Sequence, residues 1–400
     1  MKASFYENNR AKLVAQLSGG LVCIAAYSRV QRTNDTFQPF VQEASFLYLS
    51  GIVEPDCWLI IDGHSQKSWL VAPSVGSVHQ TFDGSLDADQ AQQISGITKV
   101  VEAREGEALL RQLARKHSIV YTVDQPSWID RTNFVPNPAL AKHRAMLERI
   151  FTKVQSCNKE LASLRAYKQP EELAAITKAT NATVAAFAKV HAKLATYGHE
   201  YEVEAEFSYE FRRQGLSHAY DPIVAYGANA CTLHYTKNSD VLRGKNFLLM
   251  DVGASVDGYA SDITRTYAYK EPTKRQAAVH QAVQEAQQQI IALLGPDVDV
   301  ARYQTQVDEI MLEALRSLNL VGSDPHKSLR RYMPHAVSHG LGLDVHDSLG
   351  GPAAFAPSMV LTVEPGIYIP EESIGVRIED DIVITDSGRK NLSQKLPISW

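Results

Sequence analysis

Carboxylate side chains in the second half of the chain are spaced as two pairs of cross-strand neighbours. In the first pair, Asp251 and Asp262 are eleven residues apart, with the hairpin-forming dipeptide Asp257-Gly258 between them. Residues at an odd separation about a turn can lie opposite each other, and opposed side chains point to the same face of a sheet. The midpoint falls between Val256 and Asp257, so we expect the carboxylates of Asp251 and Asp262 to face each other directly.

Glu364 and Glu379 form the second pair. They are fifteen residues apart, and their midpoint falls in the polar connection between two apolar, strand-like segments. The same rule makes them opposed carboxylates on one face of a second hairpin. Arg377 precedes Glu379 by two residues, so we expect its guanidinium group on that face as well.

Three histidines, His335, His339 and His346, fall within twelve residues just before the second hairpin. Gly340 and Gly342 argue against a regular helix in this segment. The His335/His339 spacing is therefore not the helical metalloprotease motif, which also needs a glutamate after its first histidine. We expect an irregular segment that presents several imidazole groups.

Like charges that face each other destabilise a sheet unless a positive charge lies between them. Four inward carboxylates with one or two imidazoles and no thiolate suit Mn²⁺, Co²⁺, Fe²⁺ or Zn²⁺, and bridging carboxylates support two ions about 3.5–4 Å apart. The pattern predicts a two-metal hydrolase, because such a pair of ions lowers the pKa of a shared water and polarises a carbonyl oxygen. The alternatives are a first hairpin shifted by two residues with solvated carboxylates, and histidines beside a surface turn.

The remaining polar groups of these segments are expected to bind substrate, stabilise a tetrahedral oxyanion and move protons. They are His234, His335, His346, Tyr368 and Arg377. His234 ends the second of two strands expected within residues 223–235, where a purely structural histidine is equally consistent with the pattern.

Length and composition restrict the class of protein. Four hundred residues predict two domains, and 44% hydrophobic with 21% charged residues is typical of a globular protein. A net charge of -5 and a pI near 6.2 argue against nucleic-acid and membrane partners. The polar N-terminus does not resemble a signal peptide, and four cysteines without Cys-x-x-Cys spacing indicate reduced thiols of a cytoplasmic protein.

The periodicity of apolar residues predicts a small α/β domain over residues 1–160 and a second domain over residues 161–400. In the first we expect a helix over 5–17, strands over 21–26, 46–49, 58–61, 68–71 and 119–123, and a long linking helix over 136–166. In the second we expect helices over 170–196, 201–214, 274–294 and 301–318.

Four motifs in this order resemble the pita-bread metallopeptidases, which include Xaa-Pro aminopeptidase, prolidase and methionine aminopeptidase: Asp251-x(10)-Asp262, the His335-to-His346 cluster, Glu364-Pro-Gly-Ile-Tyr368 and Val376-Arg-Ile-Glu-Asp380. In the first domain, Arg32-Thr-Asn-Asp-Thr and Phe46-Leu-Tyr-Leu-Ser-Gly-Ile-Val-Glu-Pro resemble the N-terminal domain that Xaa-Pro aminopeptidases and prolidases share and methionine aminopeptidase lacks. The resemblance implies an α/β N-terminal domain followed by a pita-bread catalytic domain with a pseudo-two-fold antiparallel sheet.

The same resemblance implies roles for individual residues and a set of partners. The metal ligands would be Asp251, Asp262, His339, Glu364 and Glu379, with Glu364 also transferring protons. His234, His335 and His346 would contact substrate or shuttle protons, and Tyr368 and Arg377 would support the metal ligands and the substrate. Two divalent ions, Mn²⁺ first, a proline-containing peptide and a homo-oligomer (dimer or tetramer) are implied. Val41 stands where the family commonly has arginine, which leaves that arginine's role at the interface or entrance open.

An Xaa-Pro aminopeptidase is favoured over a prolidase. The connection Ile369-Pro-Glu-Glu-Ser-Ile374 lacks the insertion whose arginine, in longer prolidases, suits a dipeptide's free carboxylate, and its acidic pair would repel that group. Short prolidases also exist, so prolidase stays the near alternative. A non-catalytic binding module and a metal-free creatinase-like hydrolase are more remote, since all five ligand positions are intact.

Overall fold

The computed structural model describes residues 1–126, 129, 134–244 and 246–400 of the chain. The chain divides into two compact units, Met1–Leu164 and Arg165–Trp400. None of the helices in the described part of the chain combines the length and apolar character that a membrane span requires.

The first unit is built on a six-stranded mixed sheet with the strand order β6-β5-β4-β1-β7-β8. β1, β4 and β5 pair antiparallel, whereas β6, β7 and β8 join as parallel strands. The strands of this sheet are β1 (Leu21–Ala25), β4 (Trp58–Asp62), β5 (Lys67–Ala72), β6 (Lys99–Glu102), β7 (Ile119–Thr122) and β8 (Lys153–Ser156); β2 (Gln31–Thr33) and β3 (Thr36–Phe37) form a separate ribbon. The helices are α1 (Ala3–Gln16), α2 (Ala44–Ser50), α3 (Ser77–Asp83), α4 (Ala88–Ser95), α5 (Ala103–Leu113), α6 (Ala139–Glu148) and α7 (Asn158–Ala166).

The predicted strand over residues 46–49 is wrong, because this segment is part of α2. The side chain of Glu43 accepts a hydrogen bond from the Phe46 N–H at 2.5 Å, and Gly51 ends the helix with a φ of 69°. A short apolar run is buried on all sides in either conformation, so periodicity alone could not distinguish the two.

The single long helix predicted over residues 136–166 is also wrong. The segment forms α6, the edge strand β8 and then α7. β8 pairs with β7 from Ile119↔Lys153 to Thr122↔Ser156, and Phe151 packs into the core of this unit. The sheet edge therefore satisfies backbone groups that a continuous helix would have bonded internally.

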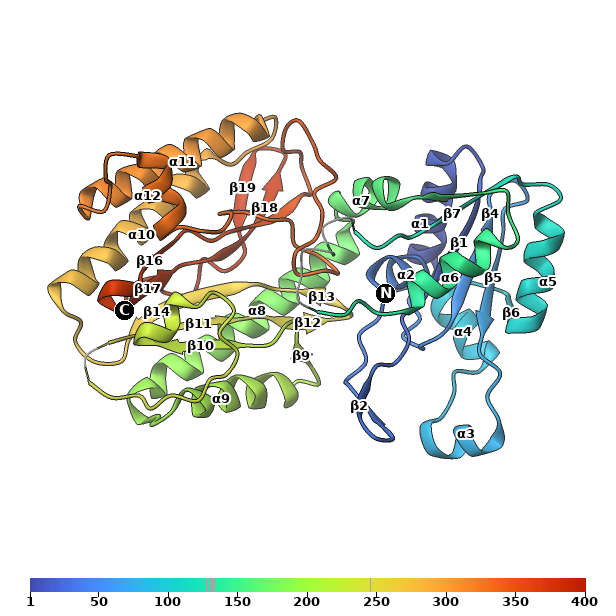
Figure 1. Ribbon diagram of the computed structural model, residues 1–400, viewed down its shortest axis with the longest axis horizontal. Helices are drawn as coiled ribbons and strands as arrows, with labels where there is room; N and C mark the ends of the chain where they lie inside the picture. The colour runs from blue at the N-terminus through green and yellow to red at the C-terminus, as the bar shows by residue number, and fades with distance from the viewer. Residues whose placement is uncertain (127–128, 130–133, 245) are drawn as a thin grey trace. The chain divides into compact units, whose positions relative to one another are not determined.

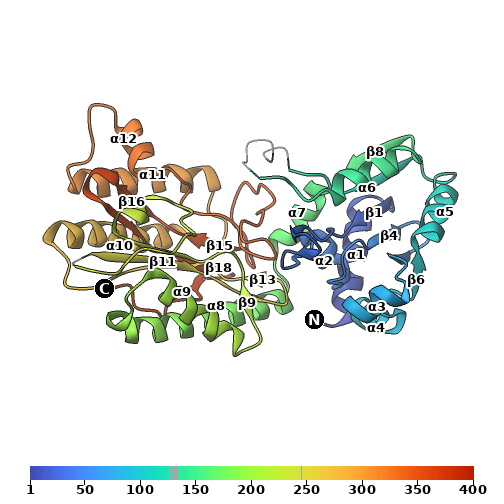
Figure 2. The same cartoon turned by 60° about the horizontal axis from the view of Figure 1, so that its bottom comes forward.

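The second unit places strands between two groups of helices (Figures 1 and 2). α8 (Pro170–Lys193) and α9 (Glu200–Arg212) pack together on one side, and α10 (Lys274–Leu293) and α11 (Val300–Ser317) pack together on the other. These four helices confirm the predicted ones within a few residues. Local signals explain two of the starts: Thr273 and Gln276 form a capping box at α10, and Pro170 occupies the first turn of α8.

Antiparallel ribbons form the interior of the second unit. The strands are β9 (Ser217–His218), β10 (Ile223–Tyr226), β11 (Phe247–Val252), β12 (Ala254–Val256), β13 (Tyr259–Ala260), β14 (Ile263–Ala268), β15 (Val360–Val363), β16 (Gly366–Ile369), β17 (Ile374–Arg377), β18 (Asp380–Thr385) and β19 (Gly388–Asn391). Helix α12 (Pro325–Tyr332) and the 3₁₀ segments η2 (Leu194–Thr196), η3 (Gly227–Cys231) and η4 (Pro370–Glu372) complete the unit. One three-stranded sheet has the order β10-β11-β14 and another β15-β18-β19.

Two apolar cores hold these layers. One joins α10, α11 and the second hairpin, and the other joins α8, α9 and the first hairpin. The carboxylate-bearing hairpins are therefore each anchored to a separate pair of helices, which makes them rigid supports for a polar site.

Candidate metal centre

The first hairpin has a register that differs from the predicted one. Asp251 lies opposite Thr264, not Asp262, because the turn residues are Asp257 and Gly258, with φ angles of 52° and 86°. A two-residue turn of this kind centres the hairpin one position later along the chain than we expected. The partner of every residue therefore shifts by two, so side chains keep their face. Direct opposition is wrong, but Asp251 and Asp262 still share a face.

The second hairpin has the predicted register. The flanking pairs Val363↔Asp380 and Gly366↔Arg377 align Glu364 with Glu379. The backbone groups of the two glutamates bond outside their own hairpin. The Glu364 N–H donates to the Val337 carbonyl at 2.8 Å, and the Glu379 N–H donates to the Thr264 carbonyl at 3.0 Å. The second hairpin is thereby joined both to the histidine segment and to the first hairpin.

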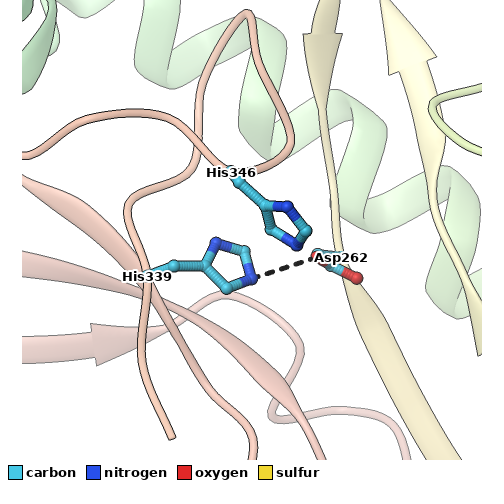
Figure 3. A group of neighbouring side chains, drawn as sticks. All are labelled: Asp262, His339 and His346. Carbon is cyan, nitrogen blue, oxygen red and sulfur yellow. Dashed lines mark ion pairs between the residues drawn. The ribbon is translucent and has the colours of Figure 1, made fainter. Parts of the chain in front are cut away.

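The five predicted ligands converge at this junction. Ligand atoms within 4.8 Å of one another form three overlapping groups, of which Figure 3 shows the last: Asp251, Asp262 and Glu379; His339, Glu364 and Glu379; and Asp262, His339 and His346. His339 Nε2 lies 3.5 Å from Asp262 Oδ2 and 3.4 Å from Glu364 Oε1. Asp262 and Glu379 each belong to two groups, which is the arrangement that bridging carboxylates require.

The carboxylates of this cluster repel one another in a buried space. Burial, followed by the charges of Asp262, Glu364 and Asp251, raises the pKa of Glu379 well above its usual range. Burial likewise raises the pKa of Glu364 to about 8. Burial lowers the pKa of His339, but its hydrogen bond to Asp262 and the nearby negative charges raise it to about 9 overall. The site therefore attracts positive charge, and its oxygen-rich donor set fits divalent metal ions.

Arg377 and Tyr368 lie beside the cluster, as predicted. The Arg377 guanidinium donates to Asp251 Oδ2 at 2.6 Å and to the Tyr368 hydroxyl at 2.8 Å. His335 Nε2 lies 2.9 Å from the same hydroxyl, and its Nδ1 lies 2.7 Å from the carbonyl oxygen of Ala336. Burial, with the charge of Arg377, lowers the pKa of His335 to about 4. These contacts tie His335 to Asp251 through two intervening side chains.

His234 and His346 are the two exposed members of the predicted set. The His346 ring stands edge-on to His339, with 4.5 Å between ring centroids. The expected second strand before His234 is wrong, because Gly227, with a φ of 57°, leads from β10 into η3 and a turn. His234 still lies close enough that its charge lowers the pKa values of His335 and His346.

Residues that the sequence analysis did not single out also contact the cluster. The Tyr220 hydroxyl lies 2.6 Å from Oδ1 of both Asp251 and Asp262. Asp381 accepts the Asp262 N–H at 3.2 Å and the Thr180 hydroxyl at 2.8 Å. Asp381 follows Glu379 by two residues, so the same-face rule could have found it. No comparable signal marks Tyr220.

Comparison with known proteins identifies the family of the chain. The profile of Metallopeptidase family M24 matches residues 174–386, and that of the Aminopeptidase P, N-terminal domain matches residues 6–121. The chain is 31% identical to an Xaa-Pro aminopeptidase of Escherichia coli, over 97% of this chain and 94% of that protein. It is 32% identical to Xaa-Pro aminopeptidase 3 of Rattus norvegicus, over 91% of this chain and 76% of the relative.

Solved structures show the same fold. Aminopeptidase P from E. coli in its low-pH form superposes with a TM-score of 0.87 at 28% identity, covering 99% of this chain and 96% of that one. Proline aminopeptidase P II from Yersinia pestis gives a TM-score of 0.85 at 31% identity, covering 99% and 97%. These matches confirm the predicted α/β N-terminal domain followed by a pita-bread domain. The chain belongs to metallopeptidase family M24, the pita-bread metallopeptidases, and to the type that comprises Xaa-Pro aminopeptidases and prolidases.

Proposed function

We propose that the protein is a two-metal Xaa-Pro aminopeptidase, which removes an N-terminal residue that precedes proline. The observation that carries this proposal is the convergence of Asp251, Asp262, His339, Glu364 and Glu379, with two of the carboxylates shared between ligand groups. The relatives named Xaa-Pro aminopeptidase match nearly the whole chain, which extends the support from metal binding to the type of peptide.

The donor set indicates which ions would bind. Bound there, two divalent ions would activate a water molecule for attack and polarise the carbonyl group before proline. We propose Mn²⁺ because oxygen ligands outnumber the single imidazole, with Co²⁺, Zn²⁺ and Fe²⁺ as the other candidates. A related solved structure is described as a zinc-substituted E. coli aminopeptidase P in complex with product.

The hydrogen bonds assign the donor and acceptor roles of Arg377, Tyr368 and His335. Arg377 can only donate to the Tyr368 oxygen, so the Tyr368 hydroxyl is free to donate to His335 Nε2. His335 then carries its proton on Nδ1, which donates to the Ala336 carbonyl. Both of these protons are engaged, so we assign Tyr368 to holding His335 and Arg377 in place, His335 to contacts with the peptide, and Glu364 to carrying the proton to the leaving nitrogen.

We assign His234 and His346 to contacts with the peptide, because both are exposed beside the cluster. The Asp251 carboxylate differs from them in being held by Arg377 at 2.6 Å. Its orientation is therefore set by the protein before any ligand arrives, whereas the two histidine rings can adjust to substrate.

The acidic pair in the second hairpin does not support the choice of aminopeptidase over prolidase. Glu371 accepts hydrogen bonds from Arg331 and Tyr332, and Glu372 forms an ion pair with Arg275. These partners offset the two negative charges that were expected to repel a dipeptide carboxylate. The preference for an aminopeptidase rests instead on the similarity of almost the entire chain to Xaa-Pro aminopeptidases.

A pair of peptides tests the proposal. With Mn²⁺ present, Ala-Pro-Ala should release alanine, and the Asp262→Ala variant should lose turnover because it removes a ligand shared by two groups. Far-ultraviolet circular dichroism should show that the variant keeps its fold. Cleavage confined to Ala-Pro would identify a prolidase, and no cleavage of either peptide by metal-loaded protein would favour the binding module.

Assembly and location are proposed separately. We propose a homo-oligomer, since Val41 and Val53 expose 76% and 60% of their surface, and light scattering on the purified chain would reveal a monomer. A cytoplasmic location is consistent with the four cysteines, each of which is a free thiol in the described part of the chain.

A further inference from the structure

A network of charged side chains lies behind the segment that carries His339 and His346. Arg165 Nη2 lies 2.5 Å from Asp344 Oδ2 and 2.9 Å from Asp347 Oδ1, and Lys168 Nζ lies 3.4 Å from Asp347 Oδ2. The Lys168 side chain is only 1% exposed and that of Asp347 only 4%. Residues 179 positions apart in the sequence are thereby joined in a buried ion pair.

Asp347 closes the loop that begins at His339. Its N–H donates to the Gly340 carbonyl at 2.9 Å, and the same carbonyl accepts a hydrogen bond from His339 Nδ1 at 2.9 Å. His339 Nε2 is thereby left to face Asp262 and Glu364. The position of Asp347 thus determines where the carbonyl that orients the His339 ring lies.

The glycines of this loop are required by the same contacts. A Cβ atom on Gly342 would lie 2.1 Å from Asp347 Oδ2 and 3.1 Å from Lys168 Cε, and one on Gly340 would lie 2.4 Å from the Asp347 carbonyl oxygen. Any other residue at these two positions would push the loop away from Lys168. The glycines therefore permit the close approach of the loop to the ion pair.

The network also reaches the first hairpin. The charge of Lys168 acts on buried Glu172, whose Oε1 accepts the Tyr259 hydroxyl at 3.0 Å. The next residue along, Ala260, donates its N–H to the Gly342 carbonyl at 2.9 Å. Lys168 is thus placed between the loop with the histidines and the hairpin with Asp251 and Asp262.

We infer that Lys168 and Arg165 are positioning residues for the metal centre. By holding Asp347, they fix the Gly340 carbonyl and hence the direction of His339 Nε2, together with the place of His346 at the other end of the loop. This inference rests on the proposed function only in taking His339 as a metal ligand. Groups that orient a ligating imidazole typically change metal affinity or activity by about 10- to 100-fold.

The test uses Lys168→Met in the full chain, because methionine keeps the length of the apolar stem and removes the ammonium group. Protein stripped with EDTA is titrated with Mn²⁺ in a calorimeter, and turnover of Ala-Pro-Ala is measured at saturating Mn²⁺. We expect the Kd for Mn²⁺ to rise about 10-fold or more and kcat to fall more than KM changes. Wild-type affinity and kcat in a folded Lys168→Met protein would overturn the inference.

Loss of stability alone must be separated from loss of position. Val190→Ala is the control, because Val190 is fully buried in the core formed around α8 and α9 and lies outside the ion network. It should lower the melting temperature without changing the Kd for Mn²⁺. If both variants weaken Mn²⁺ binding in proportion to their lost stability, the role of Lys168 is structural and the inference fails.

A milder variant covers the case in which Lys168→Met does not fold. The Asp344 side chain is 55% exposed and is the outer partner of Arg165. Asp344→Ala removes only this partner and is expected to raise the Kd for Mn²⁺ about threefold. An unchanged Kd would count against the inference. A wild-type protein that binds Mn²⁺ but cleaves neither peptide would refute the proposed function. Because Mn²⁺ binding is measured without substrate, the Kd values of the variants for Mn²⁺ would then still decide this inference.

Discussion

Glu379→Gln should make the metal-free protein more stable while abolishing most of its stabilisation by metal. The substitution keeps the shape of the side chain and removes one negative charge. The hydrogen bond that Thr264 Oγ1 donates to Glu379 Oε2 at 2.6 Å can be kept by the amide oxygen. The effect on stability therefore measures how strongly the buried carboxylates repel one another.

The magnitude follows from the spacing of the carboxylates. Burial and the charges of Asp262, Glu364 and Asp251 raise the pKa of Glu379 well above its usual range, so these carboxylates destabilise the folded, metal-free protein at neutral pH. Two unit charges 4.8 Å apart at an effective dielectric constant of about 20 repel by about 3 kcal/mol. We therefore expect a gain of about 3 kcal/mol in the free energy of unfolding.

The sign of the pH dependence is also determined. The folded state binds a proton at Glu379 more tightly than the unfolded state does, so the wild-type protein loses stability as the pH rises above 4.5. The difference between variant and wild type should therefore vanish near pH 4.5 and be largest at neutral pH. Urea unfolding in EDTA between pH 4.5 and 7.5 measures it.

Added Mn²⁺ should make the wild-type protein more stable than Glu379→Gln. At Mn²⁺ concentrations about 1,000 times the Kd, binding stabilises the wild-type protein by about 4 kcal/mol, whereas the variant lacks a ligand shared by two groups. Glu313→Gln is the control, because its side chain is 74% exposed and pairs only with Arg316 in the described contacts. A variant that is less stable than wild type in EDTA, or equally stabilised by Mn²⁺, would refute the view that repulsion among these carboxylates is relieved by cations.

Two further predictions concern groups outside the ligand set. Burial lowers the pKa of His280 to about 4; its Nε2 donates to the Thr266 carbonyl at 3.1 Å, and its Nδ1 lacks a partner in the described structure. Since the unfolded chain is protonated first as the pH falls, the free energy of unfolding should drop by about 3 kcal/mol between pH 6.5 and 4. In His280→Phe, the free energy of unfolding measured with urea should depend less on pH over that range, and an unchanged pH dependence would contradict the assignment. Tyr220→Phe removes the hydroxyl that lies 2.6 Å from Asp251 and Asp262, so the EDTA-treated variant should be about 2 kcal/mol less stable by the same measurement, and no loss would show that this hydroxyl is not bonded to either carboxylate.

The spacing of residues predicted the second hairpin correctly and the first only in part. Glu364 and Glu379 align because the whole segment between them acts as one symmetric connection. In the first hairpin the turn residues are the predicted Asp257 and Gly258, but they centre the hairpin between themselves, one position later than the midpoint of Asp251 and Asp262. Asp251 and Asp262 still lie on one face of the sheet, because side chains alternate with a period of two and the register differs by two residues.

Local sequence could not distinguish elements whose conformation depends on distant partners. The segment around Phe46 became a helix through a cap from Glu43 and a glycine at its end. Residues 153–156 became an edge strand because β7 offered unpaired backbone groups. In both cases the apolar pattern is compatible with either conformation, and packing selects one.

The sequence by itself determined which candidate ligands would come together, because carboxylates at odd spacing about turns share a face of a sheet, and the five predicted ligands do lie close to one another. Tertiary structure alone decided which groups surround them. Tyr220 reaches Asp251 and Asp262 from 31 and 42 residues away, and Lys168 reaches Asp347 from 179 residues away. Such contacts depend on how the helices pack on the two hairpins, and no local periodicity records that packing.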